Sequence, residues 1–255
     1  MLDVDLIEKA LKLAGEISLT FFRNNVKSWT KQDGSVLTEA DLAVNDAVHT
    51  LLQEALLEDG WLSEEGPDDP TRLSKNRCWI VDPIDGTRSF SHGRDEWCIG
   101  MCLVENGQPI VAGVLHPSIG KLFLAQKGLG AKLNGKRIQV NDAATLDGAK
   151  IAGRPAALRR IAATHSLPVD VSHTPQIARL TMLAASEVDV VASFGLKHDW
   201  DIAPGALLVT EAGGKITDET GQPMLFNRAL PRQNGLVASG VLRHGVVMKA
   251  MEKNV

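Results

Sequence analysis

Apolar residues recur at helical spacing in two segments near the start of the chain. Between residues 5 and 22, and again between residues 39 and 57, they return every three or four positions, which gathers them on one face of a helix. Thr38 and Asp41 stand at the start of the second segment with the spacing of a capping pair. The pattern therefore predicts two amphipathic helices. Their apolar positions are Leu6, Ala10, Leu13, Ala14 and Ile17 in the first, and Leu42, Ala47, Val48, Leu51, Leu52 and Ala55 in the second.

Short apolar runs separated by turn-forming residues follow, and they have the length and composition of buried strands. Asn106-Gly107 and Ser118–Gly120 separate three of these runs, and such residues are typical of the turns in antiparallel hairpins. The segment between residues 60 and 76 is polar and turn-rich, and no strand is predicted in it. The runs lie at 78–81, 98–104, 110–115 and 121–125.

The second half of the chain alternates short strand-like and helix-like segments, which indicates an α/β layer. Asn, Asp, Gly and Ala collect between residues 141 and 148, where we expect a boundary. The sequence thus predicts a layered protein with an α+β part at residues 1–145 and an α/β part at residues 146–255. The strands are predicted at 150–152, 188–192, 215–217 and 236–238, and the helices at 155–163, 174–185, 202–212 and 242–251.

Composition narrows the class of protein. The chain has 255 residues, enough for a sizeable core, and its net charge of -4 argues against a nucleic-acid or membrane surface. No apolar stretch approaches the roughly 20 residues that span a bilayer. Cys78, Cys98 and Cys102 lie among apolar residues without metal-site spacing, which predicts buried thiols. The start of the chain lacks the pattern of a signal peptide, so a cytoplasmic location is expected.

The segment Trp79-Ile80-Val81-Asp82-Pro83-Ile84-Asp85-Gly86-Thr87 carries the most informative chemistry. An apolar strand runs into Asp82 and Asp85, and Pro83 fixes the backbone between them. Gly86 permits a close turn, after which backbone amides and the Thr87 hydroxyl can receive an anion. Carboxylates without Cys or His suit a hard cation such as Mg²⁺. An Asp-rich turn that merely closes a strand has the same pattern.

Two further acidic segments have alternative interpretations. Glu64 and Glu65 are adjacent and repel each other unless they are solvated or share a cation. Most such pairs are surface acids. Asp201 stands where a helix is predicted to begin, so it is a candidate either for an N-cap or for a metal ligand beside a phosphate.

These segments together resemble the inositol monophosphatase family. The matching stretches are KQDGSVLTEAD from Lys31, SEE from Ser63, WIVDPIDGT from Trp79 and WDIAPGALLVTEAGG ending at Gly214, in the family's order. The resemblance implies an αβαβα sandwich related to fructose-1,6-bisphosphatase, commonly assembled as a homodimer. It also implies a magnesium-dependent phosphatase that acts on a small soluble phosphate monoester and is inhibited by lithium.

The resemblance implies a set of metal ligands as well. Glu64 would bind a metal, Asp82 would bridge two metals, and the Ile84 carbonyl would complete the first site. Asp85 and Asp201 would hold the second. Two or three Mg²⁺ ions are expected, with Mn²⁺ as a substitute.

The remaining implied roles concern water and phosphate. Thr87 with Asp41 would orient and deprotonate the attacking water, with Glu65 in support. The amides of Gly86 and Thr87 would receive the phosphate, and Lys31 lies on a loop that closes over the site in the family. Capping a helix and orienting water both require a carboxylate at the position of Asp41, so the pattern alone does not separate them.

The substrate is the most open question. Inositol-specific members generally carry a glutamate where this chain has Phe194, and Leu-Ser-Glu-Glu resembles bacterial 3'(2'),5'-bisphosphate nucleotidases. We therefore favour a nucleotidase, with inositol-1-monophosphatase and histidinol-phosphate phosphatase as alternatives. Phe194 is a candidate for stacking a base or for the core. Arg154 and Lys197 are candidates for a second phosphate or for the solvated surface.

Two non-enzymatic classes fit less well. A binding protein that kept only the fold has no need of the Asp41–Thr87 pair, and a calcium-binding structural protein lacks a loop of alternating acids.

Overall fold

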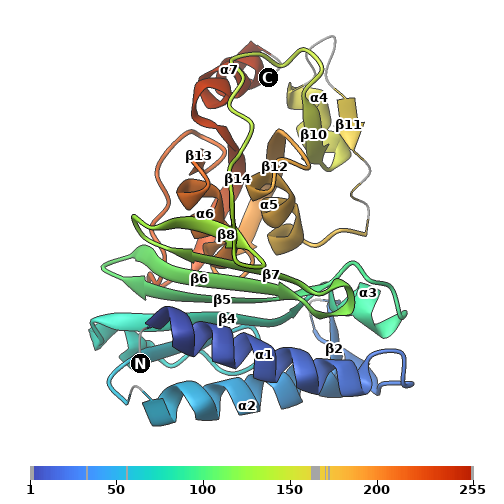
Figure 1. Ribbon diagram of the computed structural model, residues 1–255, viewed down its shortest axis with the longest axis vertical. Helices are drawn as coiled ribbons and strands as arrows, with labels where there is room; N and C mark the ends of the chain where they lie inside the picture. The colour runs from blue at the N-terminus through green and yellow to red at the C-terminus, as the bar shows by residue number, and fades with distance from the viewer. Residues whose placement is uncertain are drawn as a thin grey trace.

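Five layers of helix and sheet build the molecule. The computed structural model describes residues 3–32, 34–55, 57–161, 167–169, 171 and 173–253. In Figure 1 a pair of helices lies below a seven-stranded sheet, a second pair separates it from a five-stranded sheet, and a third pair covers the far side. The predicted αβαβα sandwich is therefore confirmed. From bottom to top the pairs are α1 (Asp3–Phe21) with α2 (Glu39–Ala55), α5 (Gln176–Ala184) with α6 (Ala203–Glu211), and α4 (Pro155–Ile161) with α7 (Val241–Lys253).

The seven-stranded sheet runs in the order β3-β4-β5-β6-β7-β8-β9. Only β3 and β4 pair in parallel, and the other neighbours are antiparallel. The four predicted strands are confirmed as β4 to β7, whereas β3, β8 and β9 are short strands that were not predicted. The bounds are β3 (Gly60–Ser63), β4 (Arg77–Asp85), β5 (Cys98–Glu105), β6 (Gln108–His116), β7 (Lys121–Gln126), β8 (Gly130–Leu133) and β9 (Lys136–Ile138).

Residues 78–81 of strand β4 are apolar, as expected for a strand with both of its faces covered. Cys78 and Ile80 pack into the core between the two sheets, where α5 and α6 lie. Trp79 and Val81 point the other way and pack against α1 and α2. The three cysteines are free and buried, as predicted.

The five-stranded sheet has the order β11-β10-β12-β14-β13. Strand β10 is parallel to β11 and β12, and β14 is antiparallel to β12 and β13. Four strands and the helices of this half are confirmed, β11 was not predicted, and residues 162–163 of the predicted helix 155–163 lie outside the described residues. The bounds are β10 (Lys150–Gly153), β11 (Leu167–Val169), β12 (Val190–His198), β13 (Gly214–Thr217) and β14 (Arg232–Gly240).

Smaller elements surround the first sheet. They are the hairpin β1 (Ser28–Thr30) and β2 (Val36–Thr38), helix α3 (Thr87–Ser91), and the 3-10 helices η1 (Pro70–Ser74) and η2 (Pro117–Ile119).

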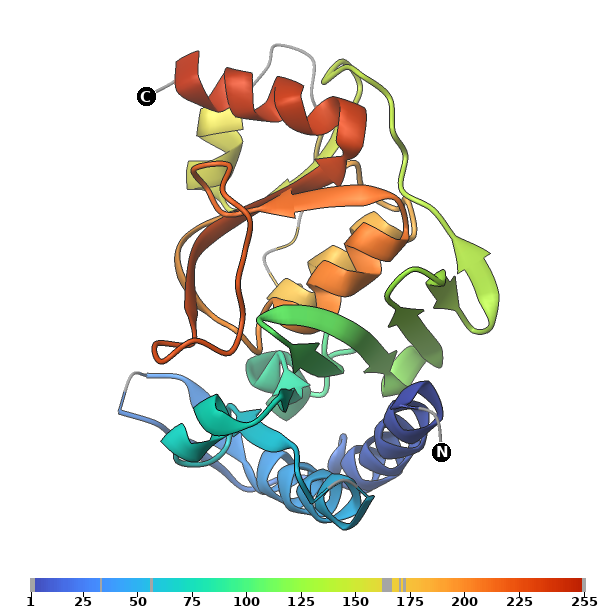
Figure 2. The ribbon, with the colours of Figure 1, turned by 90° about the vertical axis from the view of Figure 1, so that its left-hand side faces the viewer.

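Helices α5 and α6 lie between the two sheets, as Figure 2 shows. The division of the chain into two parts at residue 145 stays a prediction. No helix among the described residues is long and apolar enough to cross a membrane.

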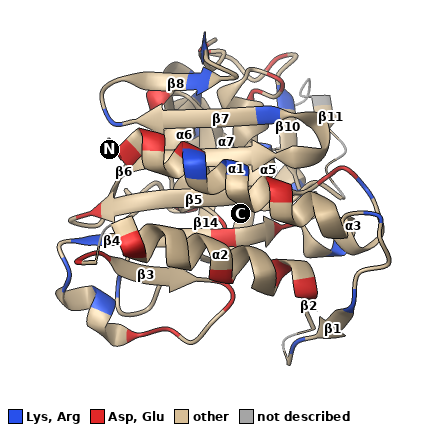
Figure 3. Cartoon of the chain, turned by 60° about the horizontal axis from the view of Figure 1, so that its bottom comes forward, with Lys and Arg blue, Asp and Glu red and all other residues tan. Residues whose placement is uncertain are grey.

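Acidic residues dominate the face formed by α1 and α2. Figure 3 shows red segments on both helices, and α2 carries no Lys or Arg, whereas α1 carries Lys9 and Lys12 among its acids. This face therefore does not present the basic stripe that a nucleic-acid polymer requires.

Candidate metal centre and active site

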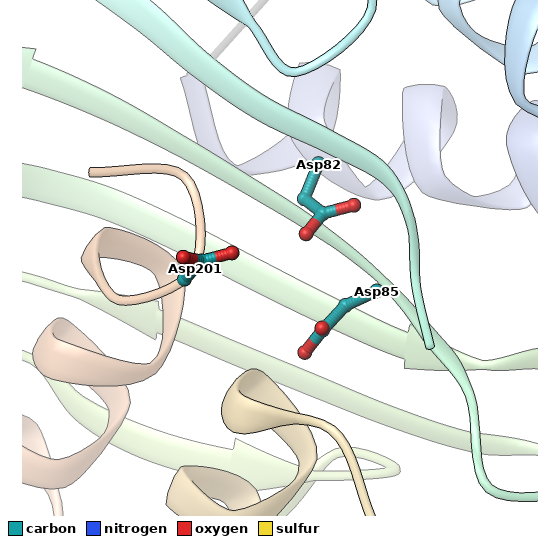
Figure 4. Close-up of side chains that lie close together, drawn as sticks. All are labelled: Asp82, Asp85 and Asp201. Carbon is teal, nitrogen blue, oxygen red and sulfur yellow. The ribbon is translucent and has the colours of Figure 1, made fainter. Parts of the chain in front are cut away.

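Three aspartates converge at the centre of the molecule. Asp82 and Asp85 lie at the end of β4, on either side of a register shift that follows from the intervening Pro83. Asp201 comes from the loop between β12 and α6. One carboxylate oxygen from each residue lies within 4.8 Å of the others. Figure 4 shows the three carboxylates gathered around one point. The fold thus unites carboxylates that are far apart in the sequence.

Asp82 is the most unusual of these side chains. It is fully buried, and neither carboxylate oxygen has a hydrogen-bond partner among the described residues. Burial, followed by the charges of Glu64, Asp85 and Asp201, raises its pKa well above the usual range. A buried, unpartnered carboxylate is costly unless a cation compensates it. Because the donors are all carboxylate oxygens, the set fits Mg²⁺ or Mn²⁺ rather than a thiophilic metal.

Backbone donors orient the other two aspartates. The Ile177 N–H, in the first turn of α5, donates to Oδ2 of Asp85 at 2.6 Å. The His198 N–H donates to Oδ2 of Asp201 at 3.0 Å, and burial raises the pKa of Asp201 to about 7. The N-cap of α6 is Ile202, which has no side-chain cap. The interpretation of Asp201 as an N-cap is therefore wrong.

Strand β3, which sequence reasoning missed, brings the glutamate pair to the site. It pairs in parallel with β4, so Glu64 and Glu65 follow its end. Lys31 Nζ contacts Glu64 Oε1 at 3.0 Å and Glu65 Oε1 at 2.6 Å. Burial raises the pKa of Glu65 to about 7, against the hydrogen bond from Lys31. An ammonium group thus bridges the two glutamates. Glu64 is not one of the three carboxylates that lie within 4.8 Å of one another, but its charge contributes to the raised pKa of Asp82 and of Asp201.

Asp41 divides its two oxygens between two tasks. Its Oδ2 accepts from the Thr38 N–H at 2.8 Å and from the Thr38 hydroxyl, so the predicted capping pair is confirmed. Its Oδ1 accepts from the Thr87 hydroxyl at 3.2 Å, and that hydroxyl also lies 3.0 Å from the Ile84 carbonyl oxygen. Burial raises the pKa of Asp41 to about 6. The capping role and the contact with Thr87 are therefore compatible.

Gly86 fixes the turn between Asp85 and Thr87. Its φ is +98°, a left-handed conformation that favours glycine. A Cβ atom there would lie 2.8 Å from the Glu96 carbonyl oxygen. Helix α3 begins directly afterwards, so the amides of Gly86 and Thr87 stand at its start.

The proposed substrate residues lie in three different environments. Phe194 packs into the apolar layer below α4 and α7, and the Arg160 guanidinium lies 4.7 Å above its ring, so the structure does not bring Phe194 to the aspartates. This placement matches the core alternative. Lys197 is partly buried and attracted by Asp201, whereas Arg154 is exposed directly after β10.

Sequence reasoning also missed Arg179. This arginine is buried on α5, and its charge opposes the rise that burial causes in the pKa of Asp85. The available signal was a single cation within an otherwise apolar helical segment.

Comparison with known proteins points to one family. The profile of the inositol monophosphatase family matches residues 3–255. Inositol-1-monophosphatase of Mesorhizobium japonicum is 30% identical over 251 residues, which cover 93% of each chain. Fructose-1,6-bisphosphatase/inositol-1-monophosphatase of Thermotoga maritima is 28% identical over 267 residues, covering 98% of this chain and 97% of that one. The solved inositol monophosphatase structure from Thermotoga maritima is 25% identical and has a TM-score of 0.86, covering 99% of this chain and 98% of that one.

Proposed function

Because the chain belongs to the inositol monophosphatase family, whose members hydrolyse phosphate monoesters, we propose that it is a Mg²⁺-dependent phosphatase of a small phosphorylated metabolite. The observation that carries this proposal is the fully buried, unpartnered Asp82 within the group of three aspartates. Hydrolysis of a bound monoester also requires an oriented, deprotonated water molecule. We assign this task to Asp41 and Thr87, which are hydrogen-bonded to each other.

The chain offers a complete set of oxygen ligands for the metal. The carboxylates of Glu64, Asp82, Asp85 and Asp201 and the carbonyl of Ile84 would hold two or three Mg²⁺ ions. When bound, Mg²⁺ supplies the positive charge that lets a nucleophile approach an anionic phosphate. Without that charge, the carboxylates would repel the substrate.

Thr87 and Asp41 are suited to orient the attacking water. A hydroxyl has one proton and two lone pairs, so Thr87 can accept from water while it donates to Asp41. A carboxylate with a pKa of about 6 can take up a proton near neutral pH. Glu65 and Lys31 form an ion pair and would support this water-orienting pair. The amides of Gly86 and Thr87 would donate hydrogen bonds to phosphate oxygens.

The identity of the alcohol remains a separate proposal. Because the partly buried Phe194 packs against the apolar layer below α4 and α7, base stacking by this residue does not support a 3'(2'),5'-bisphosphate nucleotidase. The absence of a glutamate at this position still argues against inositol 1-phosphate. The nucleotidase proposal therefore depends on the basic residues Lys197 and Arg154. Phe194→Leu should leave unchanged the ratio of the rates at which nucleotide and inositol phosphate are hydrolysed. The homodimer and the cytoplasmic location stay predictions.

Phosphate release from p-nitrophenyl phosphate tests the proposed function. We expect activity to vanish with a chelator and to return with Mg²⁺, and excess Ca²⁺ to inhibit because it accepts larger, irregular coordination. Asp82→Asn should lose nearly all turnover while the fold survives, whereas Asp5→Asn, an exposed aspartate on α1, should change nothing. Full activity after removal of the metal would refute the proposal.

A further inference from the structure

A buried arginine joins two segments that lie far apart in the sequence. Arg72, on η1, is 1% exposed, and its Nε and Nη2 groups donate to the two carboxylate oxygens of Asp68 at 2.6 and 2.8 Å. Its Nη1 group donates to Asn227 Oδ1 at 2.5 Å, and Nη2 also donates to the Arg228 carbonyl oxygen at 3.1 Å. A planar guanidinium fixes the direction of each partner. Arg72 therefore holds the loop at 225–231 against the segment that follows β3.

The contacts continue from Asn227 to a buried aspartate. The Asn227 N–H donates to Asp199 Oδ2 at 2.8 Å, and the side-chain amide of Gln233 donates to Asp199 Oδ1 at 2.7 Å. The same amide nitrogen of Gln233 donates to the Leu225 carbonyl oxygen at 2.8 Å. Asp199 is fully buried, so these donors replace the water that its carboxylate has lost.

Asp199 also closes the turn that contains Asp201. Its carbonyl oxygen accepts from the N–H groups of Ile202 at 3.1 Å and Ala203 at 2.8 Å. Its own N–H donates to the Pro231 carbonyl oxygen at 2.9 Å. The carboxylate of Asp201 faces two others, which repel it until a cation binds. The anchored turn keeps Asp201 in place against that repulsion.

The other end of this series of contacts leads to Glu64. Arg72 lies on the segment that follows Glu64, and it packs against the start of β3, the strand that ends just before Glu64. The packing is close, because a Cβ atom added at Gly60 would lie 2.9 Å from the Cβ atom of Arg72. Protein groups alone therefore connect the segment that carries Glu64 with the turn that carries Asp201.

We propose that Arg72, Asn227 and Asp199 are positioning residues that fix the separation of Glu64 and Asp201 before the metal binds. They act through the backbone of the two segments and touch neither metal nor substrate. This rests on the proposed function, which assigns Glu64 and Asp201 as metal ligands. Residues that orient metal ligands typically contribute about 10- to 100-fold to metal affinity or activity.

Calorimetric titration with Mn²⁺ measures metal affinity without turnover. Asp199→Asn keeps the shape of the side chain but leaves one acceptor oxygen, and it should weaken Mn²⁺ binding about 10-fold or more. Asn227→Gly removes the oxygen that Arg72 contacts and tolerates the φ of +58° at this position, so it should act in the same direction. Asn227→Asp keeps that oxygen and should bind Mn²⁺ within about threefold of the wild type, because a carboxylate accepts well from a guanidinium.

Arg77→Met is the matched control. Arg77 also pairs with aspartates, Asp59 at 2.9 Å and Asp3 at 3.1 Å, but it lies at the opposite end of β4 from the metal centre. This variant should lower the melting temperature and leave Mn²⁺ affinity unchanged. The positioning variants should lose affinity well below their own melting temperatures. If Asp199→Asn does not fold, the two Asn227 variants decide the question.

Unchanged Mn²⁺ affinity in the folded positioning variants, or an equal loss in Arg77→Met, would overturn the inference. A wild-type protein that binds no Mn²⁺ would also overturn it, because there would be no metal site to position. A wild-type protein that binds Mn²⁺ but hydrolyses no phosphate monoester would refute only the proposed function.

Discussion

Replacing Thr87 by valine isolates the hydroxyl that touches Asp41. Valine has nearly the same shape, so the buried position stays filled while the 3.2 Å contact with Asp41 and the 3.0 Å contact with Ile84 are lost. Oxygen Oδ1 of Asp41 then loses its partner, whereas Oδ2 keeps its bonds to Thr38. If the pair orients and deprotonates water, turnover should fall on the order of 10²-fold or more.

Steady-state phosphate release with saturating Mg²⁺ measures this effect, and the Mg²⁺-dependent rise in melting temperature shows whether metal binding survives. Thr87→Ser, which keeps the hydroxyl, should retain turnover within about tenfold. We expect Thr87→Val to lose kcat and keep the thermal response to Mg²⁺. A valine variant that turns over within a factor of about three of the wild type would refute the assigned role.

Three more perturbations test separate features. Millimolar Li⁺, with half the charge of Mg²⁺, should inhibit uncompetitively by holding product at Asp82, Asp85 and Asp201, and excess Mg²⁺ should relieve it; indifference to Li⁺ would reject this. Burial lowers the pKa of His116 to about 4, so below about pH 6.5 the unfolded chain binds a proton that the folded protein does not. The free energy of unfolding should then fall by up to about 3 kcal/mol between pH 6.5 and pH 4. Urea titrations measure this fall, which should be smaller in His116→Gln. Gly86→Ala should lower melting temperature and activity more than Gly120→Ala, whose added Cβ would meet no atom within 4 Å.

Apolar patterning predicted the parts of the fold that are buried on a regular surface. The strands β4 to β7 and the long helices α1 and α2 combine a strong pattern with sufficient length. Strand β3 has only four residues, and its parallel partner follows after a polar connection, so neither length nor local turn chemistry revealed it. The contact of Lys31 with Glu64 depends on that pairing and was equally hidden.

Side-chain direction explains the difficulty with Phe194. Val190 and Ala192 face the layer below α4 and α7, and Phe194 continues that alternation along β12. The alternation of side chains between the two faces of a strand could be expected from the sequence. Which face packs against α4 and α7 depends on where those helices lie, and the sequence pattern does not give this.

Arg179 was hidden for a related reason. An isolated arginine in a helix is ordinarily solvent-exposed, and only the packing of α5 between two sheets buries it. Its proximity to Asp85 is a tertiary relationship between residues that no local pattern connects.

The distribution of the three aspartates along the chain has a consequence for biosynthesis. Asp82 and Asp85 leave the ribosome more than a hundred residues before Asp201. During that interval the two acids are made without their third partner. The three-aspartate group can form only after Asp201 has emerged, so a chain truncated before α6 (Ala203–Glu211) and its preceding loop would lack this group.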